Sequence, residues 1–123
     1  MNQHTHNGIS GWIGVDLDGT LAHYDGIWKG ESVIGEPIPL MLGRVEAWLA
    51  AGVIVKIFTA RVAGHGIKDL RGNVVDAITP IQDWCEKHLG RVLEITNVKD
   101  YGMIALYDDR AYRVEMNTGC IIK

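Results

Sequence analysis

An apolar segment that runs directly into two carboxylates constrains this chain more than any other feature. Residues 12–17 read Trp-Ile-Gly-Val-Asp-Leu, and Asp18, Gly19 and Thr20 follow at once. A short apolar run that ends in a turn signal is typical of a buried strand, and glycine allows a sharp turn at its end. Because ligands of open α/β sheets bind outside the carboxyl ends of the strands, we expect Asp16 and Asp18 to lie at a functional edge.

Two other interpretations of these acids compete with this one. A calcium loop of the Asp-x-Asp type needs flanking helices and a bidentate Glu at its twelfth position. Counting from Asp16, that position is Ile27, and an apolar strand comes before the loop, so the calcium interpretation fails. The acids can also be two solvated loop residues, but an Asp-x-Asp-Gly-Thr sequence directly after a strand is a narrow pattern.

The rest of the chain alternates apolar runs with helical patterns. Further strands are expected at 53–58, 92–96 and 103–107, with a short fifth at 112–116. Helices are expected at 40–51 and 80–89. Strands that alternate with helices predict an α/β fold, here a three-layer, Rossmann-like and mainly parallel sheet with 12–17 as its central strand.

The second helix has clear end signals. Thr79 is the expected N-cap, Pro80 occupies the first helical position, Gln82 completes a capping box and Gly90 ends the helix.

Two glycine-rich segments lie beside the expected site. Residues 21–39 predict a short β-flap or an ordered loop, in which Tyr24 and Trp28 either cover a substrate or pack the segment onto the body. Residues 62–73 are rich in glycine and basic side chains and predict a loop, with or without a helical turn.

Composition limits the class of protein. The 123 residues suit a single domain, expected at 11–123 after a flexible polar tail at 1–10. A net charge of −3 predicts no general nucleic-acid-binding surface, although a nucleic-acid end stays open as a substrate. Only two cysteines, no signal peptide and no membrane-spanning apolar run predict a cytoplasmic protein without a membrane partner. An oligomer is allowed by the sequence but not implied.

The expected strands end in residues that phosphoryl transfer requires. Thr59 offers a hydroxyl that can donate to a phosphate oxygen, and Lys99 offers a compact cation. Asp108 and Asp109 would repel Asp16 and a phosphate unless a cation lay between them. Hard oxygen ligands with an open position for phosphate favour Mg²⁺.

These residues resemble, in order, the four motifs of the haloacid dehalogenase (HAD) superfamily of phosphotransfer enzymes. Residues 16–20 resemble the first motif, Thr59 the second, Lys99 the third and Asp108-Asp109 the fourth. The likeness extends from about Trp12 to Arg113. It is strongest to small HAD-like proteins of phages and prophages, and looser to the phosphatase domains of polynucleotide end-repair enzymes.

The resemblance implies roles for individual residues. Asp16 would be the nucleophile and Asp18 the general acid and base. The metal would be held by the Asp16 carboxylate, the Asp18 backbone carbonyl and Asp108, with Asp109 acting directly or through water.

Each later motif also has a plain structural interpretation. Thr59 can be a helix cap, Lys99 a surface lysine with Lys68 as its substitute, and either of Asp108 and Asp109 a turn residue. Arg61 and Arg110 are expected to pair with the acids rather than to contact substrate.

The chain has no room for the cap domain of larger HAD members, so the resemblance implies the capless type. The function expected is a Mg²⁺-dependent phosphomonoester hydrolase (a HAD-like phosphatase) with an aspartyl-phosphate intermediate, open to large substrates such as a nucleic-acid end. The alternative is a non-catalytic module of HAD fold that binds Mg²⁺ or a phospho-ligand. A response-regulator-like receiver is disfavoured, because it needs neither Asp18 nor Gly-Thr after the nucleophile.

Overall fold

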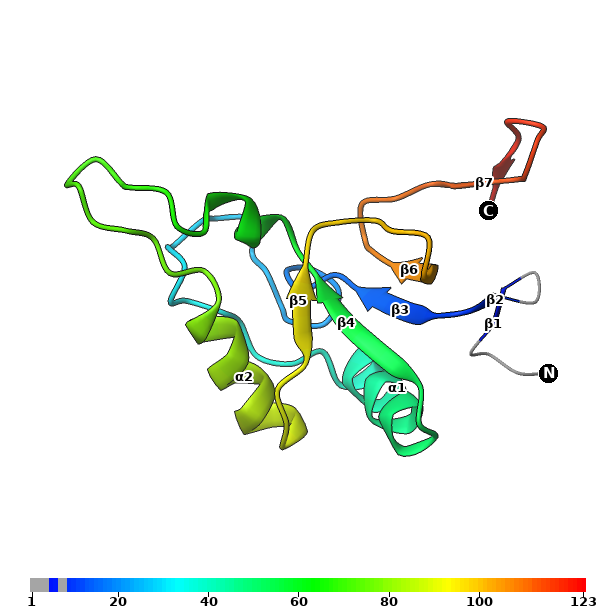
Figure 1. Ribbon diagram of the computed structural model, residues 1–123, viewed down its shortest axis with the longest axis horizontal. Helices are drawn as coiled ribbons and strands as arrows, with labels where there is room; N and C mark the ends of the chain where they lie inside the picture. Colours follow the sequence, from blue (N-terminus) through cyan, green and yellow to red (C-terminus); the bar gives the residue numbers. More distant parts are fainter. Residues whose placement is uncertain (1–4, 7–8) are drawn as a thin grey trace.

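Four parallel strands form the centre of the computed structural model, which describes residues 5–6 and 9–123. The strands are β3 (Trp12–Val15), β4 (Ile54–Phe58), β5 (Glu94–Thr96) and β6 (Met103–Tyr107). Their order is β5-β4-β3-β6 (Figure 1). β4 and β5 are added on one side of β3 and β6 on the other, which gives the Rossmann-like layout predicted from the sequence.

Both helices cover the same face of this sheet. Helix α1 (Pro39–Ala50) joins β3 to β4, and α2 (Thr79–Leu89) joins β4 to β5 (Figure 1). Along β4, Val55 and Ile57 are buried while the three residues that alternate with them are not. These two side chains belong to one buried cluster that includes α1 and α2 residues such as Val45 and Ile81. The helices therefore share one core.

The prediction of a third layer is wrong. Right-handed crossovers that move in one direction across a parallel sheet place their helices on one face. A helix on the other face would have to come from the β5–β6 connection, which is only residues 97–102, whereas such crossovers usually need about a dozen residues or more. The fold has two layers over the described chain.

Side chains of the sheet and its loops cover part of the second face. The Trp12 indole Nε1 donates to Asp100 Oδ1 at 2.9 Å, and Lys56 Nζ lies 4.5 Å from the Trp12 ring centroid. Lys56 also pairs with Glu94 of β5 at 2.9 Å. Trp12 is consequently buried without a helix above it.

The start of α2 differs from its prediction. Thr79 is the first helical residue rather than the N-cap, and no side chain at the N-cap position, Ile78, caps the helix. Asp76 does so instead, because its Oδ1 accepts from Ile78 N at 3.0 Å and from Thr79 N at 2.9 Å. Gly90 ends the helix in the left-handed conformation, as predicted.

The segment between β3 and α1 is an ordered loop rather than a flap built of strands. One antiparallel bridge joins Ala22 to Pro37. The flanking hydrogen bonds run from His23 N to Glu36 O and from Ile38 N to Leu21 O, each 2.8 Å long. We call residues 21–38 the strap.

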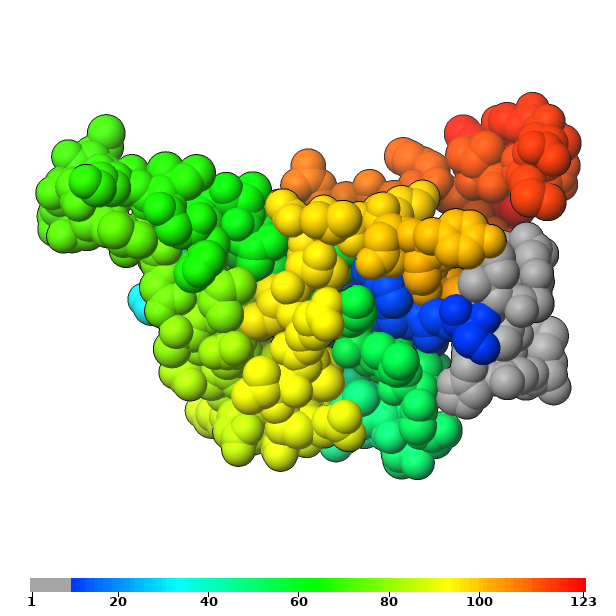
Figure 2. Space-filling view, viewed as in Figure 1, coloured from blue at the N-terminus to red at the C-terminus, as the bar shows by residue number. Residues whose placement is uncertain are grey.

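The segment between β4 and α2 contains a hairpin that the sequence did not predict. After a 3₁₀ turn, η1 (Ala60–Gly64), residues 65–76 leave the body and return, with Lys68 bridged to Val74 (Figure 1). We call residues 65–76 the finger. Figure 2 shows it projecting from one end of the molecule. Neither the strap nor the finger forms a separate domain.

Two small antiparallel pairs lie near the termini. β7 (Arg113–Val114) pairs with β8 (Ile121–Ile122) outside the main sheet, so the expected fifth strand is real but does not extend it. β1 (Thr5–His6) pairs with β2 (Ile9–Ser10). The rest of the expected tail, 1–4 and 7–8, lies outside the described residues. Neither helix of the described chain is long and apolar enough to cross a membrane.

Candidate functional site

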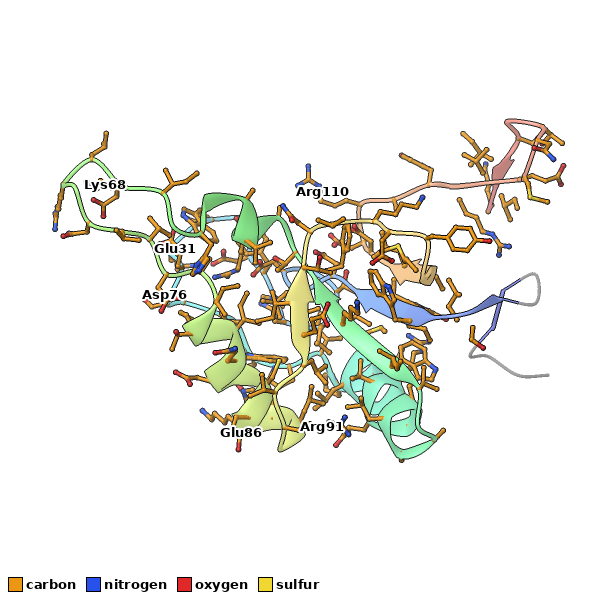
Figure 3. All side chains as sticks on the ribbon, viewed as in Figure 1. Glu31, Lys68, Asp76, Glu86, Arg91 and Arg110 are labelled. Atoms are coloured by element: carbon orange, nitrogen blue, oxygen red, sulfur yellow. The ribbon has the colours of Figure 1, made fainter. Side chains whose placement is uncertain are left out.

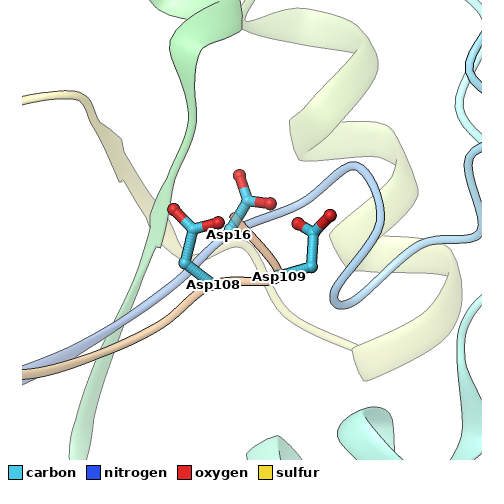
Figure 4. Close-up of side chains that lie close together, drawn as sticks. All are labelled: Asp16, Asp108 and Asp109. Carbon is cyan, nitrogen blue, oxygen red and sulfur yellow. The ribbon is translucent and has the colours of Figure 1, made fainter. Parts of the chain in front are cut away.

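Three carboxylates meet at the carboxyl edge of the sheet. Asp16 follows β3, and Asp108 and Asp109 follow the adjacent strand β6, whose Tyr107 is in register with Val15. Each acid offers an oxygen that lies within 4.8 Å of the other two, and the three side chains extend to the same side of the strand ends (Figure 4). The sequence prediction that these acids cluster agrees with this arrangement. We call them the acidic triad.

Gly19 and Thr20 fix the triad. A Cβ at Gly19 would lie 2.7 Å from Asp109 Oδ2, and the glycine has φ +91°, so the carboxylate fits only beside a residue without a side chain. The Thr20 hydroxyl accepts from Asp109 N at 3.0 Å. The same oxygen lies 3.0 Å from Asp109 Oδ1 and 3.3 Å from Asp16 Oδ2, and its single proton can serve either acid. Thr20 thus joins the ends of β3 and β6.

The triad favours protonation or a cation. Burial raises the pKa of Asp16 to about 7, assisted by the hydrogen bond with Asp109 and by the charges of Asp108 and Asp109; the Thr20 hydroxyl acts in the opposite direction. Three converging hard oxygen donors with mutual repulsion are the donor set that suits Mg²⁺. The residues present therefore fit the metal predicted from the sequence.

Asp18 lies apart from the triad and faces a buried arginine. Arg61 Nε donates to Asp18 Oδ2 at 2.7 Å, and Arg61 Nη2 donates to Asp18 Oδ1 at 2.8 Å. The arginine side chain is 4% exposed and the aspartate side chain 20%. The pairing of Arg61 with a motif acid agrees with the sequence prediction, and it occupies both carboxylate oxygens of Asp18.

Arg61 also fastens the strap. Its Nη1 donates to Glu31 O at 3.0 Å and its Nη2 to Val33 O at 2.9 Å. Its guanidinium lies 4.7 Å from the ring centroid of Trp28. One side chain therefore connects η1, the loop after β3 and the strap. Apart from the pairing of Arg61 with a motif acid, no sequence signal predicted these contacts.

The remaining expected site residues are divided between the site and the surface. Thr59 is buried and follows β4 directly, where its Oγ1 accepts from Arg61 N at 3.2 Å as the N-cap of η1. Lys99 is exposed, and no hydrogen bond or ion pair links it to the acids within the part of the chain that is described. Lys68, the substitute, lies on the finger (Figure 3). Neither lysine lines the cavity at the triad.

Within the fourth motif, Asp108 closes a turn and Arg110 lines the cavity. Asp108 Oδ1 accepts from the backbone N of Arg110 at 2.8 Å, which is the turn role predicted as an alternative for this acid. The Arg110 side chain forms no ion pair with the triad among the described residues, and it lines the cavity above it.

The acids open into a cavity of about 860 Å³. Its walls combine the triad with Thr59, Asn97 and Arg110 from the strand ends, and with Tyr24, Trp28 and Glu31 from the strap. Trp28 packs on Arg61, which is the structural alternative for this residue, and both Trp28 and Tyr24 line the cavity, so their contact with a substrate stays a prediction.

Comparison of the chain with protein-family models, with curated proteins and with solved structures finds no match.

Proposed function

We propose that the protein is a Mg²⁺-dependent phosphomonoester hydrolase of HAD type with Asp16 as its nucleophile. The observation that supports it most is the position of the triad, at the carboxyl edge of a parallel sheet and at one wall of an 860 Å³ cavity. Ligands of such sheets bind at this edge, and the cavity has the volume of a small-molecule site.

In this proposal Asp16, Asp108 and Asp109 hold the metal, with the backbone carbonyl of Asp18 as a further donor. When bound, Mg²⁺ neutralises charge on the acids and the phosphate and polarises the phosphoryl group. Without such a charge, burial and the two neighbouring acids raise the pKa of Asp16 to about 7.

The reaction proceeds in two balanced steps. An Asp16 carboxylate oxygen attacks phosphorus, the ester P–O bond breaks, and the departing alkoxide takes a proton from Asp18. Water then attacks the aspartyl-phosphate, gives a proton to Asp18, and the bond between phosphorus and Asp16 breaks. Thr59, Asn97 and Arg110 line the cavity where phosphate oxygens would lie, and hydrogen bonds to those oxygens supply much of the catalysis of such transfers.

The role of Asp18 carries a structural condition. Both of its oxygens accept from Arg61 in the present arrangement, so a proton transfer requires one N–H to withdraw. Because the same arginine holds Glu31 and Val33, the position of the strap and the availability of Asp18 are linked.

The test is turnover of a phosphoester panel with Mg²⁺ by wild type, Asp16→Asn and Glu86→Gln. Glu86 is an exposed acid of α2, remote from the cavity, and serves as the control (Figure 3). We expect Asp16→Asn to abolish turnover with an unchanged circular dichroism spectrum, and Glu86→Gln to be as active as wild type. Turnover by folded Asp16→Asn would exclude the covalent route.

Two observations favour a second candidate function: Asp18 is paired with Arg61, and Lys99 does not line the cavity at the triad. A module that only binds Mg²⁺ or a phospho-ligand would need the triad but no free general acid. It predicts metal binding by calorimetry, lost in Asp108→Ala, with no turnover of any ester.

A further inference from the structure

Two aromatic side chains of the strap line the cavity that contains the triad. Trp28 is 52% exposed and Tyr24 39% exposed, and neither belongs to the buried core. Both line the same 860 Å³ cavity as Asp16. Single exposed aromatics are common and need no explanation; Tyr101 and Tyr112, for example, are more exposed and do not line this cavity. The position of Trp28 and Tyr24 is what distinguishes them.

The indole of Trp28 is held in place by its surroundings. The Arg61 guanidinium lies 4.7 Å from the ring centroid and is itself fixed by its pair with Asp18. On the strap, Asp25 accepts from Ile27 N at 2.9 Å and from Lys29 Nζ at 2.6 Å, which fixes the turn around the tryptophan. An aromatic surface that is exposed and already ordered loses little entropy when a flat ligand group packs on it.

We propose that Trp28, with Tyr24, is a stacking subsite for the base of a nucleoside phosphate whose phosphate group lies at the triad. The proposal deepens the proposed function and rests on it. Every nucleobase offers a π-face, and aromatic side chains bind single bases by stacking. The phosphate end of the same molecule would meet the metal site and Arg110 in the same cavity.

The ligand is a terminal nucleoside phosphate, as a free nucleotide or at the end of a strand. The net charge of −3 provides no basic surface that would follow a polynucleotide backbone. Recognition therefore depends on one phosphate and one base, and both sources offer that chemistry.

The first experiment measures the preference for a base, as the ratio of kcat/KM for 2′-deoxyadenosine 5′-monophosphate to kcat/KM for glycerol phosphate. Stacking on an aromatic contributes enough to lower this ratio by ~5- to 150-fold in Trp28→Ala. Trp28→Phe keeps a flat ring and should recover most of the ratio. Tyr112→Ala removes an exposed aromatic that does not line the cavity and should leave the ratio unchanged.

A ratio that stays unchanged in Trp28→Ala, whether both esters lose activity equally or neither does, would overturn the subsite. An oligonucleotide with a 5′-phosphate, compared with the free nucleotide, identifies the source of the base. A higher kcat/KM for the oligonucleotide indicates a strand end, and a lower one a free nucleotide.

The second experiment does not depend on turnover. Asp16→Asn protein with Mg²⁺ is titrated with deoxyadenosine monophosphate and with ribose 5-phosphate, and binding is measured by calorimetry. Tighter binding of the nucleotide that is lost when Trp28→Ala is added supports the subsite. This holds even if wild type hydrolyses no ester; the proposed hydrolase activity would then be wrong, but the subsite would stand. Equal binding of the two ligands excludes the subsite.

Discussion

The strap and the finger each belong to the connection between a strand and the helix that follows it, and they are stabilised in different ways. The strap is held from outside itself: Arg61 binds two of its carbonyls, and Trp84 Nε1 of α2 donates to Gly35 O at 2.9 Å. The finger is held mainly by its own backbone, for example from Gly66 N to Val75 O at 2.9 Å. Leu70 at its tip is fully exposed.

The difference predicts how each loop responds to change. A loop fixed by buried side chains of the body unfolds with the body, whereas a hairpin fixed by its own hydrogen bonds can open alone. The strap should thus share the global free energy of unfolding, and the finger should not. The predictions below test this contrast, beginning with the largest effect.

Arg61→Ala should have the largest effect. It leaves the carboxylate of Asp18 partly buried without its cation, and it frees the strap carbonyls of Glu31 and Val33. Removing one partner of such a pair is strongly destabilising, and we expect a loss of about 3 kcal/mol in urea unfolding. Chymotrypsin should then cut the strap at its exposed aromatic residues.

The matched control for that variant is Arg71→Ala on the finger. Arg71 is exposed, and its side chain has no ion pair in the described structure, so its loss should change stability by less than ~0.5 kcal/mol. Arg61→Lys keeps the charge but not the bidentate geometry, and should recover only part of the stability. Equal effects of Arg61→Ala and Arg71→Ala would contradict the contrast between the two loops.

Asp16→Asn should act in the opposite direction, since Asp16 is partly buried beside two other acids, whereas Asp18 has a cationic partner. Its pKa in the folded protein is raised from 3.8 to about 7, so wild type loses stability as the pH rises from about 4 to 7. Without divalent cations the variant should therefore be more stable than wild type above pH 7, and no more stable below pH 4. Because the site is partly open, we expect a gain of about 1–2 kcal/mol rather than the full effect of the shift.

Mg²⁺ provides the control for the Asp16 experiment. Binding to the native state alone stabilises by mass action, so Mg²⁺ should raise the melting temperature of wild type more than that of Asp16→Asn. A variant that is less stable than wild type at pH 8 without cations would contradict the repulsion at the triad.

The strands and the acids were predictable because their signals are local. Apolar runs and the turn residues after them place Asp16 and Asp108 at strand ends, and parallel pairing brings those ends to one edge. The absence of a third layer was also within reach of the sequence. Residues 97–102 between two expected strands are too few for a crossover helix.

Most partners of single side chains were not predictable. The sequence predicted that Arg61 pairs with an acid of the motifs, but Asp18 is 43 residues away, and no local signal distinguishes it from the other motif acids. Asp76 caps α2 although Thr79 and Gln82 match a capping box, because Asp76 offers both backbone N–H groups a carboxylate. The finger was missed because its exposed Ile67, Leu70 and Val74 form no strand pattern.

Trp84→Phe should have an intermediate effect and refine the description of the strap. The substitution removes the hydrogen bond to Gly35 O while keeping an aromatic ring in the core. We expect a loss of about 1 kcal/mol and faster hydrogen exchange at His23, whose amide donates to Glu36 O beside Gly35. A loss of stability with unchanged exchange at His23 would show that packing of the Trp84 ring is responsible, rather than its hydrogen bond to Gly35 O.

Changes in the finger should have the smallest effect on global stability. Asp69 Oδ1 accepts from Arg71 N at 2.9 Å and from Asn73 N at 3.0 Å, so this side chain closes the turn at the tip. Leu70→Ser should change the free energy of unfolding by less than ~0.5 kcal/mol, because the leucine buries nothing.

Asp69→Ala should open the finger locally without unfolding the body. Trypsin should cut after Lys68 or Arg71 faster than in wild type, and the Val75 amide, which donates to Ile67 O, should exchange faster, while the urea midpoint stays constant. A urea midpoint that falls in both finger variants would mean that the finger supports the body as the strap does. The two loops would then belong to one cooperative unit, and the exposed tip would need a packing partner that its full exposure argues against.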